Sequence, residues 1–488
     1  MFTLIFSLLS VITAMIFVII ITRTLSPHEY GTWGLINSLF VYSIVINPIV
    51  TFWATREIAR GEDSGMTVLS FGGLLSMCGI IIYIVSAYFV SLESDLDLTV
   101  IFFAALLIPF TFLHKQISSI NMGWKPEIIS YAAITSEIIK IPLALLFVYS
   151  LEMGIEGIII TLIISSTTST IIQVVYGRKK ITRFIKKEFV KKWLRTIWVP
   201  LYPRAIPMLF ATDIVVFFAI TKSAEGVAFF TAALVIAGLV VYAGGISVGA
   251  YGKLLGSGKG SFLKENISQL FYFAIPFAAI SIAFSKPGLF ALNPIYEIAF
   301  PVVIFLSVRM MFFLLTQTFF SYLVGNEKVD VKPNFTFSEY LKSKLFSLPS
   351  LQIIQNSVYI IILAIVLLIE SNPVNEIDLV IHWSIIALIT QIPLTVYFGY
   401  LVKKNFALTL EWTRIAKYLL VSVGMFALSY VLYDKYLVYN TDLIQFIPNL
   451  LLFIAVGVIG YLAITYLIDS KIRILFNAIF SEIKRTKQ

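Results

Sequence analysis

Fourteen stretches of mainly apolar residues, each roughly 20 residues long, constrain this chain more than any other feature of its sequence. A helix needs about 20 such residues to cross the hydrocarbon core of a bilayer. We therefore predict fourteen membrane-spanning helices, joined by connections too short to form a folded soluble domain. The expected spans are 2–22, 31–53, 67–90, 98–113, 127–149, 155–176, 197–221, 227–251, 268–285, 296–324, 347–369, 378–402, 412–433 and 443–468.

The composition of the 488 residues excludes the other broad classes of protein. Apolar residues make up 59% of the chain and charged residues 13%, whereas a soluble domain carries about 25% charge to cover its surface. The same figures exclude a disordered or collagen-like chain. The one cysteine, Cys78, excludes a disulfide framework and a cysteine-based zinc site. We expect the first span to be a retained membrane helix rather than a signal peptide, because no small-residue cleavage site follows it.

The loop charges orient the predicted spans. With the N-terminus in the cytoplasm, the cytoplasmic loops and tail hold 29 Lys/Arg and 12 Asp/Glu. The outer loops then hold 4 Lys/Arg and 13 Asp/Glu. Cytoplasmic loops of membrane proteins carry an excess of Lys and Arg, so both termini are expected on the cytoplasmic side of the plasma membrane. The net charge of +9 therefore reflects topology, and a nucleic-acid partner is not expected.

The largest basic run, Gly177–Arg195 (GRKKITRFIKKEFVKKWLR), lies between the sixth and seventh spans. Two interpretations stay open: an amphipathic segment on anionic headgroups, or a site for the polar end of a lipid substrate. With this run as a linker, we predict four parts of the chain. We expect a six-helix lobe at 1–176, a basic cytoplasmic linker at 177–196, a second six-helix lobe at 197–402, and two extra helices with a cytoplasmic tail at 403–488.

The two lobes begin with similar hairpins. Thr22-Arg23 precedes Glu29-Tyr30-Gly31 in the first hairpin, and Thr221-Lys222 precedes Glu225-Gly226 in the seventh. Both lobes start on the same side of the membrane, so a repeat would be related by an axis along the membrane normal. The hairpins favour two pseudo-symmetric lobes around a central cavity.

Five charged residues remain inside the predicted spans: Glu137, Lys140, Arg204, Asp213 and Arg309. A charge at mid-bilayer costs at least about 2.5–3.5 kcal/mol, so such residues usually face a bundle interior or an aqueous cavity. Glu137 and Lys140 are three residues apart and share a helix face, so they either neutralise each other or both line a transport path.

The second group of intramembrane charges lies in spans seven and ten. Arg204 and Asp213 are nine residues apart, on nearly opposite helix faces, and the prolines around Arg204 interrupt its helix. Arg309 has no acidic residue within four positions. We expect it either to face the cavity and meet an anionic ligand or to pair with a residue of another helix, such as Asp213.

Motifs of soluble enzymes are absent from the sequence. There is no Walker loop and no dinucleotide glycine fingerprint. The three histidines lie on different loops or span ends, without metal-ligand spacing, and the acidic pair Asp95 and Asp97 lies in an outer loop of about eight residues. We therefore expect neither an enzyme nor a cofactor or metal site.

The segment Thr22–Leu35, TRTLSPHEYGTWGL, resembles the first-hairpin signature of the polysaccharide transporter (Wzx-like) family. That family belongs to the multidrug/oligosaccharidyl-lipid/polysaccharide exporter (MOP) superfamily. A second, weaker resemblance covers Leu209–Ala233, with Asp213 and then Glu225-Gly226. Here the chain departs from the family pattern, because Ile214 replaces a basic residue and the stretch after Gly226 is Val-Ala-Phe.

The resemblance implies a flippase that moves a lipid-(pyro)phosphate-linked oligosaccharide across the cytoplasmic membrane by alternating access. Its partners would be an undecaprenyl- or dolichyl-linked substrate, membrane lipids, glycosyltransferases of the same pathway, and H⁺ or Na⁺ as coupling ion. Arginine grips phosphate oxygens in a bidentate way. The candidate substrate-binding residues are Arg23, Lys140, Arg204 and Arg309, and the candidate coupling or ion-pair carboxylates are Glu137 and Asp213.

Two other functions stay open at this point. A drug/cation antiporter of the same superfamily would use cavity carboxylates, of which the spans hold two. A membrane glycosyltransferase or polymerase would need a sizeable outer loop, which the spans do not leave. A surface-polysaccharide or glycoprotein flippase therefore remains the function that the sequence favours.

Overall fold

The computed structural model describes residues 2–92, 97–181, 184–245, 260–325, 327, 336–370, 375–406, 408–474 and 476–477. Side chains are described from residue 12, and again from residue 263 after the gap that follows residue 245. Asp95 and the end of the expected span 227–251 lie outside the described residues.

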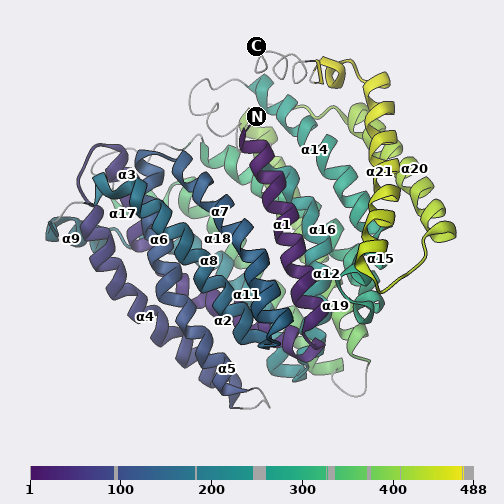
Figure 1. Ribbon diagram of the computed structural model, residues 1–488. Helices are drawn as coiled ribbons and strands as arrows, with labels where there is room; N and C mark the ends of the chain where they lie inside the picture. The colour runs from purple at the N-terminus through teal and green to yellow at the C-terminus, as the bar shows by residue number, and fades with distance from the viewer. Residues whose placement is uncertain are drawn as a thin grey trace, which may run out of the picture. The chain divides into compact units, whose positions relative to one another are not determined.

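Helices form the whole regular structure of the described residues, and no strand occurs among them. Figure 1 shows their arrangement. In chain order they are α1 Phe2–Thr24, α2 Pro27–Ile44, α3 Pro48–Ala59, α4 Gly65–Ser91, α5 Leu98–Phe103, η1 Ala104–Leu106, α6 Leu107–Trp124, α7 Glu127–Ala144, η2 Leu145–Ser150, α8 Gly154–Gly177, η3 Arg178–Lys180, α9 Lys187–Arg195, α10 Trp198–Leu201, η4 Tyr202–Arg204, α11 Ala205–Thr221, α12 Ala224–Ala237, η5 Gly238–Gly244, α14 Gly260–Ala283, α15 Ser285–Leu292, η6 Pro294–Ala299, α16 Phe300–Gly325, α17 Phe337–Leu341, α18 Lys344–Glu370, α19 Glu376–Phe406, α20 Trp412–Tyr436 and α21 Leu443–Ile468.

The expected all-α polytopic membrane fold is confirmed. Among the described residues, twelve helices are long and apolar enough to cross a membrane, and a thirteenth span is formed if the bent pair α2 and α3 counts as one. The remaining expected span corresponds to α1, of which Ile12–Thr24 is counted as a shorter apolar helix. Each of the fourteen predicted stretches therefore contains a helix.

Two of the spans are interrupted where the sequence places proline. α2 and α3 meet at an angle of 59°, and Pro48 occupies the first turn of α3. The seventh span is divided into α10, the short 3₁₀ turn η4 and α11, within a segment that holds three prolines. Proline removes a backbone donor and clashes with the preceding turn, which explains both interruptions.

The first-hairpin motif builds a helix start. Ser26 caps α2, its hydroxyl accepting the Glu29 amide hydrogen at 3.2 Å, while the Glu29 carboxylate accepts the Ser26 amide hydrogen at 2.8 Å. This reciprocal capping box, with Pro27 in the first turn, fixes where α2 begins. Glycine is required at position 31, because a Cβ there would overlap the carbonyl group of Ala224. These motif residues therefore shape the hairpin.

The described residues form two compact units. The first unit contains residues 1–229 and 352–379, and the second contains 230–351 and 380–488. The bounds of these units differ from those expected for the two six-helix lobes, 1–176 and 197–402. They do not show whether such lobes exist, so the lobes remain a prediction.

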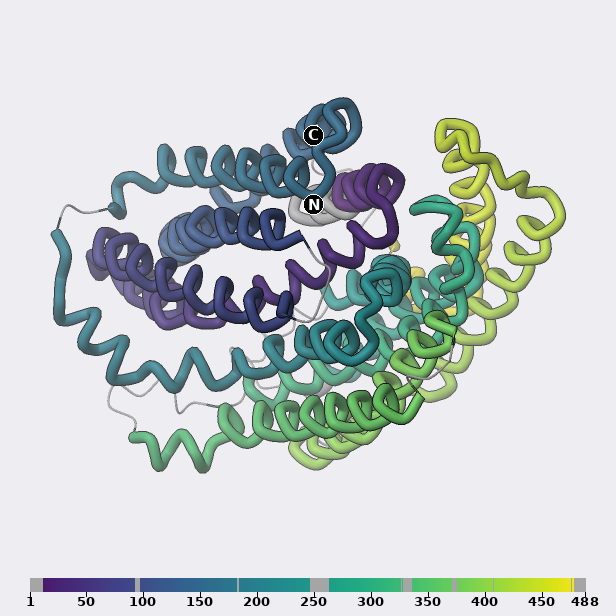
Figure 2. Tube along the Cα trace, turned by 90° about the horizontal axis from the view of Figure 1, so that it is seen from below, coloured from purple at the N-terminus to yellow at the C-terminus, as the bar shows by residue number. Residues whose placement is uncertain are grey.

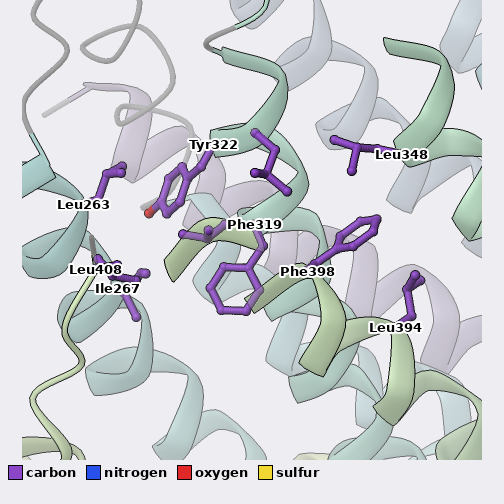
Figure 3. Close-up of a cluster of buried hydrophobic side chains, with 10 residues drawn as sticks. Leu263, Ile267, Phe319, Tyr322, Leu348, Leu394, Phe398 and Leu408 are labelled. Atoms are coloured by element: carbon purple, nitrogen blue, oxygen red, sulfur yellow. The ribbon is translucent and has the colours of Figure 1, made fainter. Parts of the chain in front are cut away.

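Buried apolar side chains form a core in the second unit. In the second unit, Phe319 and Tyr322 of α16 pack with Phe398 of α19 and with Leu263 and Ile267 of α14. Figure 3 shows these side chains converging from three helices. The Tyr322 hydroxyl, which needs a partner in such a core, donates to the Asn266 side chain.

The two C-terminal helices, α20 and α21, pack side by side within the second unit, and α20 also packs on α14 (Figures 1 and 2). Aromatic side chains fill the contact: the rings of Tyr272 and Tyr418 lie 5.1 Å apart, and those of Tyr272 and Tyr461 lie 5.4 Å apart. These helices are therefore an integral part of the second unit.

Candidate functional site

A cavity of about 580 Å³ lies wholly inside the first unit, and three cationic side chains line it: Arg56, Lys115 and Arg204. We call it the cation-lined cavity. Three helical segments distant in sequence supply these charges, namely α3, α6 and η4. The other lining residues are Val41, Ile44, Val45, Asn47, Pro48, Thr51, Phe52, Thr55, Ser118, Ser119, Met122, Ile129 and Pro207.

α3 presents Arg56 to the cavity. The guanidinium carbon lies 3.6 Å from the centroid of the Phe52 ring, one turn earlier on the same helix. Stacking on an aromatic face favours a planar cation and fixes its orientation. Thr51 and Thr55 line the cavity from the same stretch of α3, so the helix offers hydroxyl groups beside the charge.

α6 contributes a stripe of lining residues at helical spacing. Lys115, Ser118, Ser119 and Met122 follow the pattern i, i+3, i+4, i+7, which places them on one helix face. The Thr55 hydroxyl of α3 donates to the Ser119 carbonyl at 3.1 Å and so joins the two helices beside the cavity. The Lys115 side chain is exposed to the cavity, although it lies nine residues before the end of α6.

Arg204 reaches the cavity because its helix is broken. It is the last residue of η4, between Pro203 and Pro207, and its side chain is exposed. A 3₁₀ turn points side chains differently from a continuous α-helix, since it has 3.0 residues per turn. Lys115 and Arg204 are close enough for their positive charges to repel each other.

Asn47 adds an unpaired amide at the bend between α2 and α3. It is 2% exposed and lines the cavity, and neither polar atom of its side chain has a hydrogen-bond partner among the described residues. Buried polar groups are normally hydrogen-bonded, so a buried amide without a partner marks a place for a ligand or water. The amide offers both donors and an acceptor.

The electrostatics of the cavity favour an anion. None of its lining residues, all of them within the described part of the chain, is Asp or Glu. The positive charges of Lys115 and Arg204 repel each other, and an anion in the cavity would relieve that repulsion. Phosphate oxygens accept charge-assisted hydrogen bonds from guanidinium and ammonium groups, and further hydrogen bonds from nearby hydroxyls.

The predicted pair Glu137 and Lys140 lies elsewhere in the first unit. The Lys140 ammonium is 2.6 Å from the Glu137 carboxylate, which also accepts the Thr13 hydroxyl at 3.2 Å. Lys140 also lies 4.9 Å from the centroid of the Phe17 ring of α1. The pair thus connects α7 to α1, and neither residue lines the cation-lined cavity.

Asp213 is 3% exposed in α11 and lies among hydrogen-bond donors. Its carboxylate accepts the Tyr359 hydroxyl at 2.8 Å and the Ile214 amide hydrogen at 2.8 Å. Asn356, one turn before Tyr359 on α18, is 3% exposed, and its carbonyl oxygen has no hydrogen-bond partner among the described residues. A buried carboxylate such as Asp213 is suited to hold a proton or a small cation.

The remaining two predicted residues are not among those that line the cation-lined cavity. Arg309 is 1% exposed in α16, in the second unit, and Arg23 lies half-buried in the last turn of α1. The structure therefore brings one of the four predicted cations, Arg204, together with two others.

Sequence reasoning missed Arg56 and Lys115 because it assigned both to cytoplasmic loops. The apolar runs end near residues 53 and 113, but α3 continues to Ala59 and α6 to Trp124. The signal that was available is helical spacing. Thr51, Thr55 and Lys115 belong to polar stripes that continue the spans in register, beyond the point where hydropathy falls.

The basic linker docks on α3, one of the helices that line the cation-lined cavity, and on α4. α9 packs against α3 and α4 (Figure 1), and Trp193, which is fully buried, places its indole nitrogen 3.2 Å from both Glu57 oxygens. The Lys192 ammonium lies 3.1 Å from Glu57. α9 buries Trp193 and leaves Lys187 and Lys191 exposed, and its expected place on anionic headgroups stays a prediction.

Comparison with known proteins finds this fold in solved structures. No protein-family model and no curated protein matches the sequence. Among solved structures, "Lipid II flippase MurJ, inward closed conformation" matches with a TM-score of 0.69 and 16% identity, over 95% of this chain and 98% of that one. The chain has the fold of MurJ and the MATE transporters.

Two MATE structures share the fold over a smaller part of the chain. An inward-facing multidrug resistance MATE family transporter of the MOP superfamily matches with a TM-score of 0.58 and 14% identity, over 81% of this chain and 95% of that one. A MATE in the bent conformation matches with a TM-score of 0.50 and 16% identity, over 82% and 94%. Identities this low establish the fold alone.

Proposed function

We propose that this protein moves a lipid-(pyro)phosphate-linked oligosaccharide across the cytoplasmic membrane by alternating access, for surface polysaccharide or glycoprotein assembly. The observation that carries the proposal is the cation-lined cavity, in which Arg56, Lys115 and Arg204 meet without a lining carboxylate. A phosphate or diphosphate group would place negative charge in a cavity whose lining contains no Asp or Glu.

The chemistry of such a substrate fits a cavity of this kind. Its diphosphate is the one part that an apolar bundle cannot accept without cations, and hydrogen bonds to charged groups contribute about 1.5–3 kcal/mol each. The sugars need hydroxyl and amide partners, which Thr51, Ser118 and Asn47 offer. The lipid tail remains in the bilayer while the polar head passes through the protein.

The other predicted residues enter the proposal in distinct roles. Arg23 and Arg309 are further contacts for the anionic head along its path. For Lys140, the ion pair with Glu137 supports a structural role as the alternative. We propose Asp213 as the carboxylate that couples transport to H⁺ or Na⁺, because it is buried and accepts the hydroxyl of Tyr359 on α18.

The likeness of the fold to solved structures also supports the proposal. MurJ is described as a lipid II flippase, and its likeness extends over 95% of this chain, whereas the two MATE likenesses cover 81% and 82%. A lipid II flippase and the present chain therefore share their fold almost throughout.

The test is transport by the purified protein in liposomes. A fluorescent lipid-diphosphate oligosaccharide is incorporated, and its arrival in the opposite leaflet is followed by quenching with a membrane-impermeant reductant. We expect protein-dependent movement that falls when Arg204 is replaced by Ala. Equal rates with and without protein, for undecaprenyl- and dolichyl-linked substrates alike, would refute the proposal.

A drug/cation antiporter of the same superfamily is the second candidate. The buried Asp213 carboxylate favours it, since such a group can exchange a proton or Na⁺ for an organic cation. Uptake of a cationic dye into liposomes with an imposed pH or Na⁺ gradient distinguishes the two. Dye transport that needs Asp213 and is insensitive to Arg204→Ala would favour the antiporter.

The orientation and the two lobes belong to the same proposal. Lys186→Cys, made in a Cys78→Ser background because Cys78 is exposed, should be labelled from the cytoplasmic side only. Labelling of that cysteine from outside intact cells would reverse the topology. An experimental structure in which 1–176 and 197–402 do not superpose would refute the pseudo-symmetric lobes.

A further inference from the structure

A second charged cavity, of about 540 Å³, lies in the second unit where α20 begins and α21 ends. Both helices are apolar enough to span the membrane, so this cavity lies at headgroup level. We call it the α20–α21 end cavity. Its lining residues are Leu410, Glu411, Trp412, Thr413, Arg414, Lys417, Ile468, Asp469, Ser470 and Lys471.

Arg414 organises the charges around this cavity. Its Nε lies 2.6 Å from Asp469, and its Nη1 lies 3.1 Å from Glu411 and 3.2 Å from Glu265. Lys471 lies 2.9 Å from Glu265 and 3.2 Å from Glu411.

The network is balanced in charge. Lys264 completes it, with its ammonium 3.2 Å from Glu411. The cations Lys264, Arg414 and Lys471 thus match the three acids Glu265, Glu411 and Asp469. The carboxylates in the lining are therefore paired with cations. Their negative charge is largely neutralised, so they repel an incoming anion only weakly.

Two donors remain after this pairing. Lys417 lines the cavity and is exposed, and no ion pair joins it to another described residue. Arg414 is 8% exposed, and its Nη2 has no hydrogen-bond partner among the described residues. Thr413 lies one turn before Lys417 and adds a hydroxyl on the same helix face. The site therefore offers one uncompensated positive charge and several donors, at the positive end of the α20 helix dipole.

An apolar strip continues from this site along α20. Leu420, Leu428 and Val431 follow Lys417 on the same helix face and are 72%, 48% and 61% exposed. Gly424 lies between them, and a Cβ there would meet open space. Trp412, at the start of the helix, is 67% exposed, as is typical of residues at the membrane–water interface.

We infer that the α20–α21 end cavity binds the phosphodiester headgroup of an anionic glycerophospholipid, with an acyl chain along the strip from Leu420 to Val431. One phosphodiester carries one negative charge, which matches Lys417. A zwitterionic headgroup would bring a second cation into a site that has no free carboxylate. The strip favours a lipid over free phosphate, because only a lipid covers apolar surface.

Native mass spectrometry of the full chain tests this site. The protein is released from detergent after titration with dioleoylphosphatidylglycerol, dioleoylphosphatidylcholine or inorganic phosphate. We expect one tightly retained phosphatidylglycerol, at least tenfold weaker binding of phosphatidylcholine, and no effect of millimolar phosphate. Lys417→Ala should weaken phosphatidylglycerol binding about tenfold, and Thr413→Val should weaken it by a smaller factor.

Lys403→Ala is the matched control, because Lys403 is exposed at the end of α19 and does not line the cavity. It should retain the lipid as the wild type does. Equal losses in the two lysine variants would show diffuse attraction and overturn the site. Unchanged retention in Lys417→Ala would also overturn it. Displacement of the lipid by inorganic phosphate would show a free-phosphate site instead.

Discussion

The two charged cavities of this molecule have similar volumes, about 580 and 540 Å³, but they differ in their acidic residues: the first lining has none, and the second has Glu411 and Asp469. In the first unit, Arg56, Lys115 and Arg204 share a cavity whose lining holds no acid. In the second unit, Arg414 sits in a network of three cations and three carboxylates. The first cavity has cations but no acid in its lining, whereas the ion pairs of Arg414 join the start of α20 to α14 and to the end of α21.

Charge balance predicts what each cation does for stability. A paired buried cation stabilises the fold, since removing it leaves its partners buried and uncompensated. A cation in an unbalanced cavity repels its neighbours, so its removal should cost little stability. The comparison can therefore be tested by exchanging single residues in both cavities.

The largest expected effect is the loss of stability in Arg414→Ala. Three carboxylates lose their common partner, which should cost about 3–5 kcal/mol. Arg204→Ala should change the free energy of unfolding by less than about 0.5 kcal/mol. Thermal unfolding in detergent, with Lys403→Ala as control, measures both. Similar losses of unfolding free energy in Arg414→Ala and Arg204→Ala would show that the two cavities do not differ in this way.

The next effect is on transport. Arg204→Ala and Lys115→Ala should each lower the rate of lipid-linked oligosaccharide movement by about 10- to 100-fold, if each loses a charge-assisted hydrogen bond of about 1.5–3 kcal/mol. Arg204→Lys should be intermediate, because it keeps the charge and loses the bidentate fork. Rates are compared at equal amounts of reconstituted protein. Wild-type rates in both alanine variants would remove these residues from the substrate path.

A smaller effect should separate the two roles proposed for Lys140. If its pair with Glu137 is structural, Lys140→Met alone should reduce stability by about 1–3 kcal/mol, because an unpaired carboxylate remains. The double variant Glu137→Gln/Lys140→Met should regain most of the loss and transport normally. Transport that stays low in the stable double variant would place Lys140 in the substrate path.

The smallest effect concerns pH. Burial alone would raise the pKa of Glu411, but hydrogen bonds from Arg414, Lys264 and Lys471 outweigh it and lower the pKa from 4.5 to about 2. A carboxyl with a depressed pKa stabilises the fold above its unfolded pKa and loses that contribution as pH falls. The melting temperature should therefore drop between about pH 4.5 and 2, and Glu411→Gln should flatten this dependence. An equal slope in that variant would contradict the assignment.

The sequence predicted the fold better than the site, for a physical reason. Hydropathy reports which stretches prefer lipid, and every one of the fourteen contains a helix. It does not report where helices continue into polar sequence, so Arg56 and Lys115 were assigned to loops although α3 and α6 carry both. Periodicity, rather than hydropathy, holds that information.

Other site features depend on contacts that no local pattern encodes. Arg204 meets Lys115 because a proline-broken helix of the seventh span approaches the fourth, which is a tertiary contact. The pairing of Arg414 with Asp469 likewise joins two helix ends 55 residues apart. In contrast, Glu137 and Lys140 were predicted as neighbours because a helix fixes their spacing.

The most direct test of the central claim is binding of a lipid diphosphate to the cation-lined cavity. A fluorescent lipid-diphosphate analogue is titrated into purified protein, wild type or Arg56→Gln/Lys115→Gln/Arg204→Gln, with Lys403→Gln as the charge control. We predict saturable binding to the wild type and the control, weakened at least 100-fold in the triple variant, with the corresponding neutral lipid alcohol bound weakly by all three. Equal affinity of the triple variant and the wild type for the diphosphate would contradict the account.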